Sequence, residues 1–283
     1  MFGVMLRRAL RRVRSYSGEV PGELRGWRWD EPPVRPRAYL GLGVSEVAYA
    51  YCPTFRDLWL RRRGVVGEAS GPVLIGRTVH EVFHRAAWDL RRLLSRGLSP
   101  WEAYYKLYGW SYRLGLPRWA VDLYRSLTLM WAGESAASGL FYGGEGVGWL
   151  PWLSEYRVDG SLLGLSSRLR VDALEGAGVV VEVKYGGGGR RHAVGLAGYA
   201  LALESEFEVP YDYGIIVRVS GVPEGRPSVR VEPFFIGAEL RREFLERRDE
   251  AIDVLLSGME PPRPARCPRS CLFYSVCNGG DGR

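Results

Sequence analysis

The fold is decided by one stretch of the sequence: Val171-Asp172-Ala173-Leu174, then the turn Glu175-Gly176-Ala177-Gly178, then Val179-Val180-Val181-Glu182-Val183-Lys184-Tyr185. This pattern predicts a β-hairpin that carries charged side chains within an apolar sheet. Because side chains alternate along a strand, Glu182 and Lys184 are expected on one face and Val183 on the other. A buried carboxylate and ammonium cost solvation free energy unless they pair or bind a metal ion.

Asp172, on the neighbouring strand, is expected to bring a second carboxylate near Glu182. Paired carboxylates suit a hard cation such as Mg²⁺ or Mn²⁺, which polarises a phosphodiester and lowers the pKa of a bound water. Lys184 could then orient or deprotonate the attacking water, or neutralise charge that develops on the phosphate. An ordinary buried pair of Glu182 and Lys184, supported by Asp172, remains the alternative.

The second half of the chain alternates strand and helix patterns, which predicts an α/β or α+β sheet flanked by helices. The expected strands are residues 152–158, 162–174, 178–185, 213–219 and 229–236, and the expected helices are 191–204 and 239–257.

The first half reads as helical, with expected helices at residues 5–14, 45–63 (interrupted by Pro53), 77–97, 100–112 and 117–138. Residues 30–37 are rich in proline and predict a linker, after which the fold proper begins. The resulting division is 1–44 (basic helix and linker), 45–142 (helical region), 143–258 (sheet core) and 259–283 (cysteine-rich tail).

The composition favours a soluble protein that binds polyanions. The chain has 283 residues and a formal net charge of +7, which attracts nucleic acid. Its 39 basic side chains include only two lysines, Lys106 and Lys184, so a site that needs a compact ammonium would explain why Lys184 is kept. No long apolar run or signal-peptide pattern is present, so we expect a cytoplasmic protein without a membrane association.

Four cysteines complete the set of candidate site residues: Cys52, and the tail group Cys267, Cys271 and Cys277, spaced C-x3-C-x5-C. In a reducing compartment cysteines are more often metal ligands than disulfides. A structural zinc site and unligated buried cysteines are the alternatives, although zinc ribbons usually pair two C-x2-C knuckles.

Several of these motifs resemble those of RecB-like nucleases, which have the restriction-endonuclease-like PD-(D/E)xK fold. The D-(x)n-E-x-K pattern across the hairpin is joined upstream by Gly76-Arg77-Thr78-Val79-His80, which resembles the family's G-x-x-x-H motif. The resemblance implies that His80, Asp172, Glu182 and the backbone carbonyl of Val183 are metal ligands, and that Lys184 is the catalytic lysine. It also matches Tyr199 to the catalytic tyrosine of the family's Q-x-x-x-Y motif, in which Gly195 stands in place of the glutamine.

The cysteines resemble those of the iron-sulfur nucleases in this superfamily, where one cysteine precedes the nuclease motifs and three follow them. Four thiolates suit a [4Fe-4S] or a [2Fe-2S] cluster, of which the former is favoured. The tail departs by one residue from the usual C-x2-C-x5-C spacing. Such a cluster would join the N-terminal and C-terminal parts of the chain.

The full order of motifs, from Cys52 to Cys277, is similar to that of the CRISPR-associated Cas-four exonucleases. Residues 23–27 and 40–46 resemble the archaeal type I-A, Csa-one branch. The resemblance implies an exonuclease that trims single-stranded prespacer ends during CRISPR adaptation, together with the adaptation integrase proteins. Two alternatives remain: a weakly catalytic or non-catalytic DNA-binding subunit, which Gly195 favours, and a zinc-stapled nuclease of restriction or repair.

Other residues are weaker candidates for site or DNA contacts. Glu155 is a candidate accessory acid, whereas His84 and His192 are expected to pack rather than to bind metal. Three arginine runs could contact phosphates or form solvated helix faces: 7–14, 61–63 and 241–248. Four aromatic residues could stack on the bases of a single strand: Trp101, Tyr104, Tyr105 and Trp110.

Overall fold

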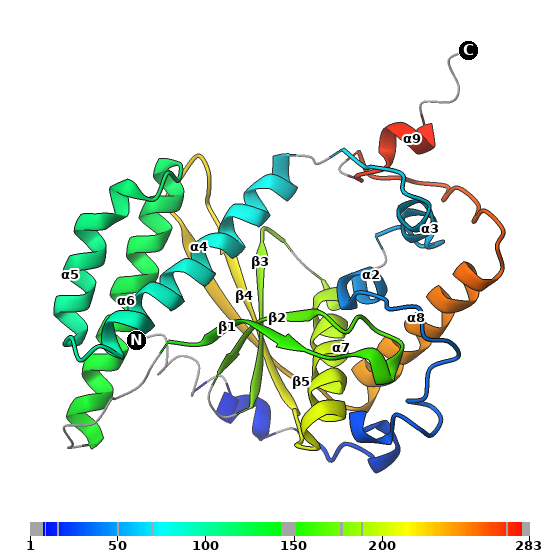
Figure 1. Cartoon of the computed structure of the whole chain (residues 1–283), viewed down its shortest axis with the longest axis horizontal. Helices are drawn as coiled ribbons and strands as arrows, with labels where there is room; N and C mark the ends of the chain where they lie inside the picture. The colour runs from blue at the N-terminus through cyan, green and yellow to red at the C-terminus, as the bar shows by residue number, and fades with distance from the viewer. Residues whose placement is uncertain are drawn as a thin grey trace.

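The computed structural model describes residues 8, 10–15, 17–49, 51–68, 71–142, 151–175, 178–187, 189–269 and 271–278, without the side chains of 139–142. Across these residues one mixed sheet of five strands separates two groups of helices (Figure 1). On one side lie α4 (Gly71–Leu94), α5 (Pro100–Trp110) and α6 (Arg118–Tyr142), and on the other lie α2 (Val44–Tyr49), α7 (Arg190–Phe207) and α8 (Ala238–Leu256). The predicted mixed α/β class is therefore confirmed.

The strands follow one another in chain order across the sheet: β1 (Leu153–Val158), β2 (Leu169–Glu175), β3 (Val179–Tyr185), β4 (Tyr213–Ser220) and β5 (Ser228–Phe235). Neighbours pair antiparallel except β3 and β4, which are parallel and joined by α7. A parallel pair needs a crossover connection of this kind. The predicted hairpin is confirmed as β2 and β3, whose register includes Ala173 opposite Val181.

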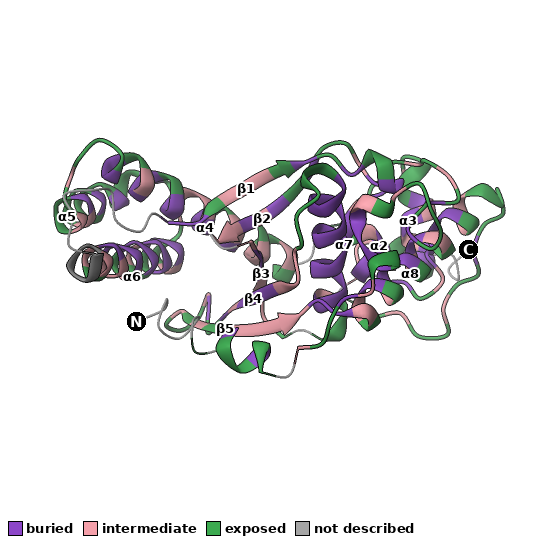
Figure 2. Cartoon of the chain, turned by 90° about the horizontal axis from the view of Figure 1, so that it is seen from below, coloured by how far each residue is buried: buried purple, intermediate pink, exposed green. Residues whose placement is uncertain are grey.

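Both faces of β3 are buried, as its valine run predicts. Val179, Val181 and Val183 pack against the helices on the α4 side, and Val180 packs on the α7 side. In Figure 2 buried residues follow the centre of the sheet and most of α7. Helix α7 is rich in alanine, glycine and leucine because it lies between the sheet and two further helices, α2 and α8.

The expected strand at residues 162–174 is wrong in its first half. A short 3-10 helix, η4 (Ser161–Leu163), occupies that part, and β2 begins only at Leu169. Asp159 accepts a hydrogen bond from the amide of Ser161 at 2.8 Å, and Gly164 ends the turn at a positive φ of 72°. These turn-forming residues override the apolar pattern of the segment.

The proline-rich stretch at 30–37, expected to be a linker, packs against the core through Val34 and Pro36, while its other residues are exposed. Val34 is buried, and so is Leu24 in η1 (Gly22–Leu24). The next short helix, η2 (Gly26–Arg28), packs on α7 through Gly26, whose amide donates to Glu204 at 2.8 Å. The division of the chain into four parts stays a prediction, but its first part contributes to the same core as α7.

A buried ionic network explains this docking. Glu204 in α7 accepts from Arg241 of α8 at 2.7 and 2.8 Å and from Arg25 at 3.0 Å, and Asp212 pairs with both arginines. Arg248 is also fully buried and donates to the carbonyl of Val34 at 2.7 Å. The expectation that the run 241–248 forms a solvated or phosphate-binding face is therefore wrong for Arg241 and Arg248.

No helix in the described part of the chain is both long and apolar enough to cross a bilayer. The remaining helical elements are α3 (Arg56–Arg62), η3 (Ser111–Arg113) and, in the tail, α9 (Tyr274–Asn278).

Candidate active site

Asp172 lies where β2 separates from β3. The ladder between these strands ends at Ala173 and Val181, so the amide of Val183 has no backbone partner on that side. The Oδ2 atom of Asp172 accepts its hydrogen bond instead, at 2.7 Å. The carboxylate thus replaces one bond of the ladder, which holds it over β3.

Glu182 and Lys184 lie on the same face of β3, as predicted, and form an ion pair. Glu182 is 1% exposed, and the Nζ atom of Lys184 also lies 3.9 Å from Oδ2 of Asp172. One ammonium therefore serves two carboxylates. Such a buried arrangement is costly unless every charge is matched, which is why it marks a candidate site rather than a source of stability.

His80 reaches this centre from α4. Its Nδ1 atom lies 3.3 Å from Oδ1 of Asp172, and the side chain is 31% exposed. Helix α4 begins at Gly71 rather than near Arg77, so His80 stands in its third turn with a fixed backbone. The structure thus brings four predicted site residues together from three elements: His80, Asp172, Glu182 and Lys184.

The two carboxylates differ in protonation behaviour. Burial favours the protonated form of both, but His80 and Lys184 outweigh burial at Asp172 and hold its pKa below the ordinary value. At Glu182 burial prevails over the nearby Lys184, and its pKa is raised. Burial disfavours the charged forms of Lys184 and His80, yet the carboxylates raise the pKa of both. Opposite shifts on neighbouring carboxylates are typical of catalytic sites.

Tyr199 of α7 lies beside the carboxylates. It is 9% exposed, and burial, then Glu182 and Asp172, raise the pKa of its hydroxyl well above the ordinary value. Its predicted catalytic role stays a prediction.

A second tyrosine, which the sequence analysis missed, contacts the centre directly. The hydroxyl of Tyr49, the last residue of α2, donates a hydrogen bond to Oε1 of Glu182. Its ring lies over Gly195, where a β-carbon would be only 3.2 Å from Cε1 of Tyr49. Glycine at the glutamine position was the one available signal, since it leaves space that another side chain must fill.

The donors of the site fit a divalent cation in their chemistry. Carboxylates suit Mg²⁺ or Mn²⁺, and the Oε2 atom of Glu182 is buried without a hydrogen-bond partner. Within the described residues no three histidine, cysteine or acidic side chains already stand in the arrangement of a metal site. The ammonium of Lys184, between Asp172 and Glu182, supplies the positive charge in this arrangement. The roles of the ligands, including the Val183 carbonyl, stay predictions.

The four cysteines lie in one neighbourhood around α3, where Cys271 and Cys277 pack with Leu60. Burial, followed by the nearby thiols of Cys271, Cys277 and Cys52, raises the pKa of the Cys267 thiol to about 11. All four are free. Soft thiolates from one neighbourhood suit an iron-sulfur cluster in donor type, and their role as ligands stays a prediction.

Contacts with the segment around α3 hold the tail independently of any cluster. The guanidinium of Arg56 donates to the carbonyl of Pro261 at 2.6 Å, and the amide of Glu68 donates to the carbonyl of Leu272 at 2.8 Å. Cys277 and Phe273 pack on Leu60. The two parts of the chain that carry the cysteines are therefore already joined.

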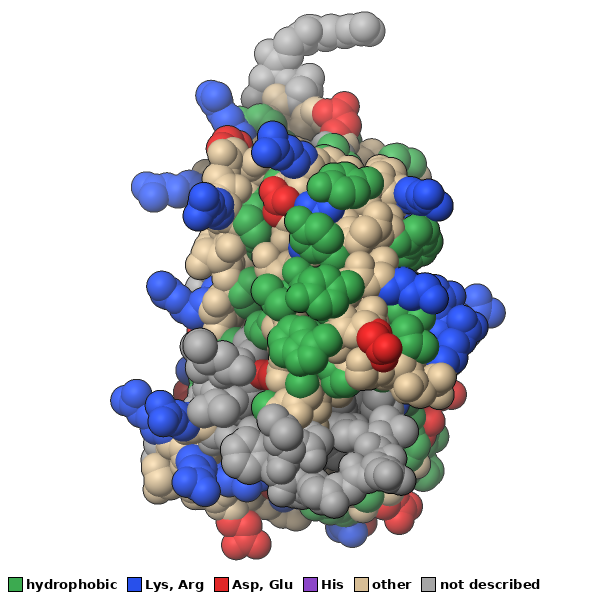
Figure 3. Space-filling view, turned by 90° about the vertical axis from the view of Figure 1, so that its left-hand side faces the viewer, with side chains coloured by type: hydrophobic (Ala, Val, Ile, Leu, Met, Phe, Trp, Pro, Cys, Tyr) green, Lys and Arg blue, Asp and Glu red, His purple; other side chains and the backbone are tan. Residues whose placement is uncertain are grey.

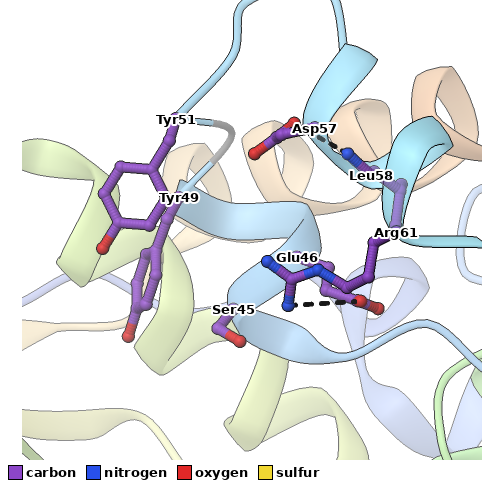
Figure 4. Close-up of a pocket in the computed structure, with 7 residues that line it drawn as sticks. All are labelled: Ser45, Glu46, Tyr49, Tyr51, Asp57, Leu58 and Arg61. Atoms are coloured by element: carbon purple, nitrogen blue, oxygen red, sulfur yellow. Dashed lines mark hydrogen bonds and ion pairs between the residues drawn. The ribbon is translucent and has the colours of Figure 1, made fainter. Parts of the chain in front are cut away.

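Two openings flank the centre. A cavity of about 230 Å³ lies between α2 and α3, where Tyr49 and Tyr51 stand side by side opposite Asp57 and Arg61 (Figure 4). A larger groove of about 500 Å³ runs outward from His80 between α4 and the β1–β2 edge.

Two of the weaker candidates, Glu155 and His84, line the larger groove. Glu155 has a left-handed backbone (φ 54°) and lies at the register position opposite Asp172, where β1 and β2 do not pair. His84 packs against Ser154 through a contact of 2.9 Å, as expected of a structural histidine. His192 packs edge-on against Tyr49, with ring centroids 5.1 Å apart.

The aromatic residues expected to stack on DNA lie on a separate face, over α5. Hydrophobic side chains gather along the middle of that face (Figure 3). Trp101, Tyr105 and Trp110 are 46%, 69% and 38% exposed, and Arg125 lies over the rings of Tyr108 and Tyr112. Their contact with DNA stays a prediction.

Fold and site together define a mixed α/β protein with a buried carboxylate–lysine centre. Residues 1–281 match the family of CRISPR-associated exonuclease Csa1. Two curated relatives bear that name: one from Thermoproteus tenax, 39% identical over 288 residues, and one from Saccharolobus solfataricus, 31% identical over 291 residues. Each alignment covers 95% of this chain and 96% of the relative. The chain therefore belongs to the Csa1 family of CRISPR-associated exonucleases, which confirms the predicted family.

Proposed function

We propose that this chain is a metal-dependent DNA exonuclease that prefers single strands and trims prespacer ends during CRISPR adaptation. The observation that carries the proposal is the convergence of His80, Asp172, Glu182 and Lys184, with one oxygen of Glu182 left without a partner. Membership of an exonuclease family supports the reaction class.

In this proposal His80, Asp172, Glu182 and the Val183 carbonyl hold Mg²⁺ or Mn²⁺. The bound ion would polarise the scissile phosphodiester and lower the pKa of the attacking water. The Lys184 ammonium would donate hydrogen bonds to that water and to the phosphate oxygens, neutralising their charge. The water oxygen would form a bond to phosphorus as the bond to the leaving oxygen breaks, with the water releasing a proton to solvent and the leaving oxygen taking one up. The buried carboxylates keep the ammonium protonated and fixed, because they raise its pKa.

Four thiolates hold an iron-sulfur cluster in the same proposal, with [4Fe-4S] favoured. It would secure the tail to the α3 segment, where Arg56 and Glu68 already bind it. Anaerobic purification followed by iron and sulfide analysis tests this. Equal amounts of iron and labile sulfide, lost in Cys271→Ser, support the cluster, whereas zinc without sulfide contradicts it.

The partners proposed are DNA ends and the proteins of the adaptation integrase. A second candidate function is a weakly catalytic subunit that binds and orients DNA, and the observation that favours it is Gly195 at the glutamine position.

Degradation of an end-labelled single-stranded oligonucleotide in Mn²⁺ separates the two candidates. We expect wild type to degrade it and Glu182→Ala and Lys184→Ala to lose about 100-fold or more, as for removal of a group that stabilises the transition state. Glu246→Ala, an exposed glutamate of α8, is the matched control. Absence of degradation by wild type, with DNA binding retained, supports the binding subunit instead.

A further inference from the structure

The groove beside His80 has the chemistry of a track for a single DNA strand. One wall is α4, which contributes His80, His84 and Trp88, and the other is the β1–β2 edge with Arg157 and Arg170. His80 and Trp88 are eight residues apart, about 12 Å along the helix. The groove therefore leads from the metal-binding candidate to an exposed tryptophan two turns away.

The two arginines are placed as a pair. Arg157 and Arg170 are register partners on antiparallel strands, so their side chains leave the sheet on the same face. Both are exposed. Two acidic residues also line the groove, and each is paired with an arginine. Oε2 of Glu155 lies 3.4 Å from Nη1 of Arg170, and Oε1 of Glu81 lies 3.4 Å from Nη1 of Arg85.

Trp88 offers an aromatic face at the outer end. It is 49% exposed, and His84 holds its ring in a T-shaped contact with centroids 6.2 Å apart. Stacking of bases on aromatic side chains, with arginines along the backbone, is the general mode of single-strand binding. A paired duplex keeps its bases stacked internally and has none to offer to Trp88.

We propose that this groove binds the substrate strand, with a base on Trp88 and phosphates on Arg157 and Arg170. The inference rests on the proposed function and names the place where its substrate lies. If the strand binds in this groove, the exposed aromatic face of α5 is not the main DNA-binding surface.

Fluorescence anisotropy of a labelled oligothymidylate in EDTA tests the groove without cleavage. We expect Trp88→Ala and Arg157→Ala/Arg170→Ala each to weaken binding about tenfold. The arginine pair should also reduce the slope of log affinity against log salt by about 1.4, the value for two lost phosphate contacts with a single strand. The matched controls are Trp101→Ala, a tryptophan of similar exposure on α5, and Arg230→Ala/Arg242→Ala, which removes two exposed arginines from β5 and α8.

Three results would refute DNA binding in the groove. The groove variants would bind the oligothymidylate like wild type, Trp101→Ala would lose as much affinity as Trp88→Ala, or the groove variants would lose the same affinity for a blunt duplex. Failure of the nuclease proposal gives a different result: no degradation in Mn²⁺, with groove-dependent binding intact.

A separate observation concerns Tyr49. Its hydroxyl bonds to Glu182, its ring centroid lies 5.2 Å from Nζ of Lys184, and its ring fills the space over Gly195. The residue is 6% exposed and touches two groups of the centre from one position. We infer that Tyr49 is a positioning residue, which fixes the Glu182 carboxylate in place of a side chain at residue 195.

Exchange of the two residues tests this inference, which also rests on the proposed function. Tyr49→Phe keeps the ring and removes the bond, so we expect about tenfold weaker Mn²⁺ binding by calorimetry and a matching rise in the Mn²⁺ needed for activity, as for loss of a group that orients a ligand. Tyr51→Phe, on the same cavity but 59% exposed, is the control.

Tyr49→Ala/Gly195→Gln should recover Mn²⁺ affinity relative to Tyr49→Ala, because the glutamine enters the space that the ring leaves. Equal Mn²⁺ affinity in wild type and Tyr49→Phe, or no recovery in the exchange, would overturn the inference. Wild type that binds Mn²⁺ but does not cleave DNA would contradict only the nuclease proposal.

Discussion

The imidazole of His80 lies 3.3 Å from one oxygen of Asp172, while the other oxygen accepts the amide of Val183 at 2.7 Å. This carboxylate is therefore shared between α4 and β3. We expect Asp172→Asn to stay folded, since its amide oxygen can still accept from Val183, and to lose about 100-fold or more of the Mn²⁺-dependent degradation. Circular dichroism and the oligonucleotide assay measure the two effects, with Asp253→Asn as an exposed control. Activity of Asp172→Asn near that of wild type would contradict a role of Asp172 in cleavage.

The network around Glu204 predicts a large effect on stability. Arg241→Ala leaves the fully buried Glu204 with one arginine partner in place of two, besides its backbone amide donors, so we expect about 3–5 kcal/mol lower free energy of unfolding. Arg242→Ala, the exposed neighbour, should stay within about 0.5 kcal/mol of wild type. Urea titration followed by tryptophan fluorescence gives both values, and similar losses in the two variants would refute the network's role.

The close contact between α7 and α8 predicts that adding one methyl group at Gly198 lowers stability. A β-carbon at Gly198 would lie 2.3 Å from Cε2 of Phe244, whose ring is fully buried. Gly198→Ala should therefore cost about 1–3 kcal/mol of stability, the usual range for overpacking. Gly187→Ala meets nothing within 4 Å and serves as the control in the same thermal unfolding experiment.

His192 predicts how stability depends on pH. Burial, followed by the charges of Lys184 and Arg218, lowers its pKa from 6.5 to about 4. Between pH 4 and 6.5 the imidazole of His192 is protonated in the unfolded chain but neutral in the folded chain. Stability should therefore fall as the pH drops from about 6.5 to 4, and because the ring is partly exposed, solvent screening keeps the contribution of this residue below the ~3 kcal/mol of the full shift. Urea titrations at several pH values should show a smaller fall in His192→Asn, and an unchanged fall would contradict the assignment.

Much of the fold follows from local patterns, because the strands and helices of residues 179–257 bury periodic apolar faces that the sequence displays. The hairpin of Asp172 and Glu182 is an example, since alternation alone predicts its two faces. Residues 162–168 depart from the prediction because Asp159 and Gly164 form a turn that apolar content does not reveal. Arg25, Arg241 and Arg248 are likewise charged residues in the core, and only their partners from distant segments make that burial possible.

The site shows the same division. His80, Asp172, Glu182 and Lys184 were found through motifs whose spacing reflects shared chemistry. Tyr49 belongs to no such motif, and its place at Glu182 depends on how α2 crosses α7. In the sequence, Gly195 indicates that a side chain is missing at this position, but it does not indicate that Tyr49 fills the space.

The scarcity of lysine gives the folded protein an unusually simple response to amine-reactive reagents. Lys184 is held by two carboxylates and 15% exposed, whereas Lys106 is exposed on α5. A bulky acylating dye should therefore modify Lys106 first among the side chains, at a known position remote from the carboxylates. One side-chain fluorophore for distance measurements to a bound partner can thus be attached at Lys106 without introducing a cysteine beside the four that the chain already has.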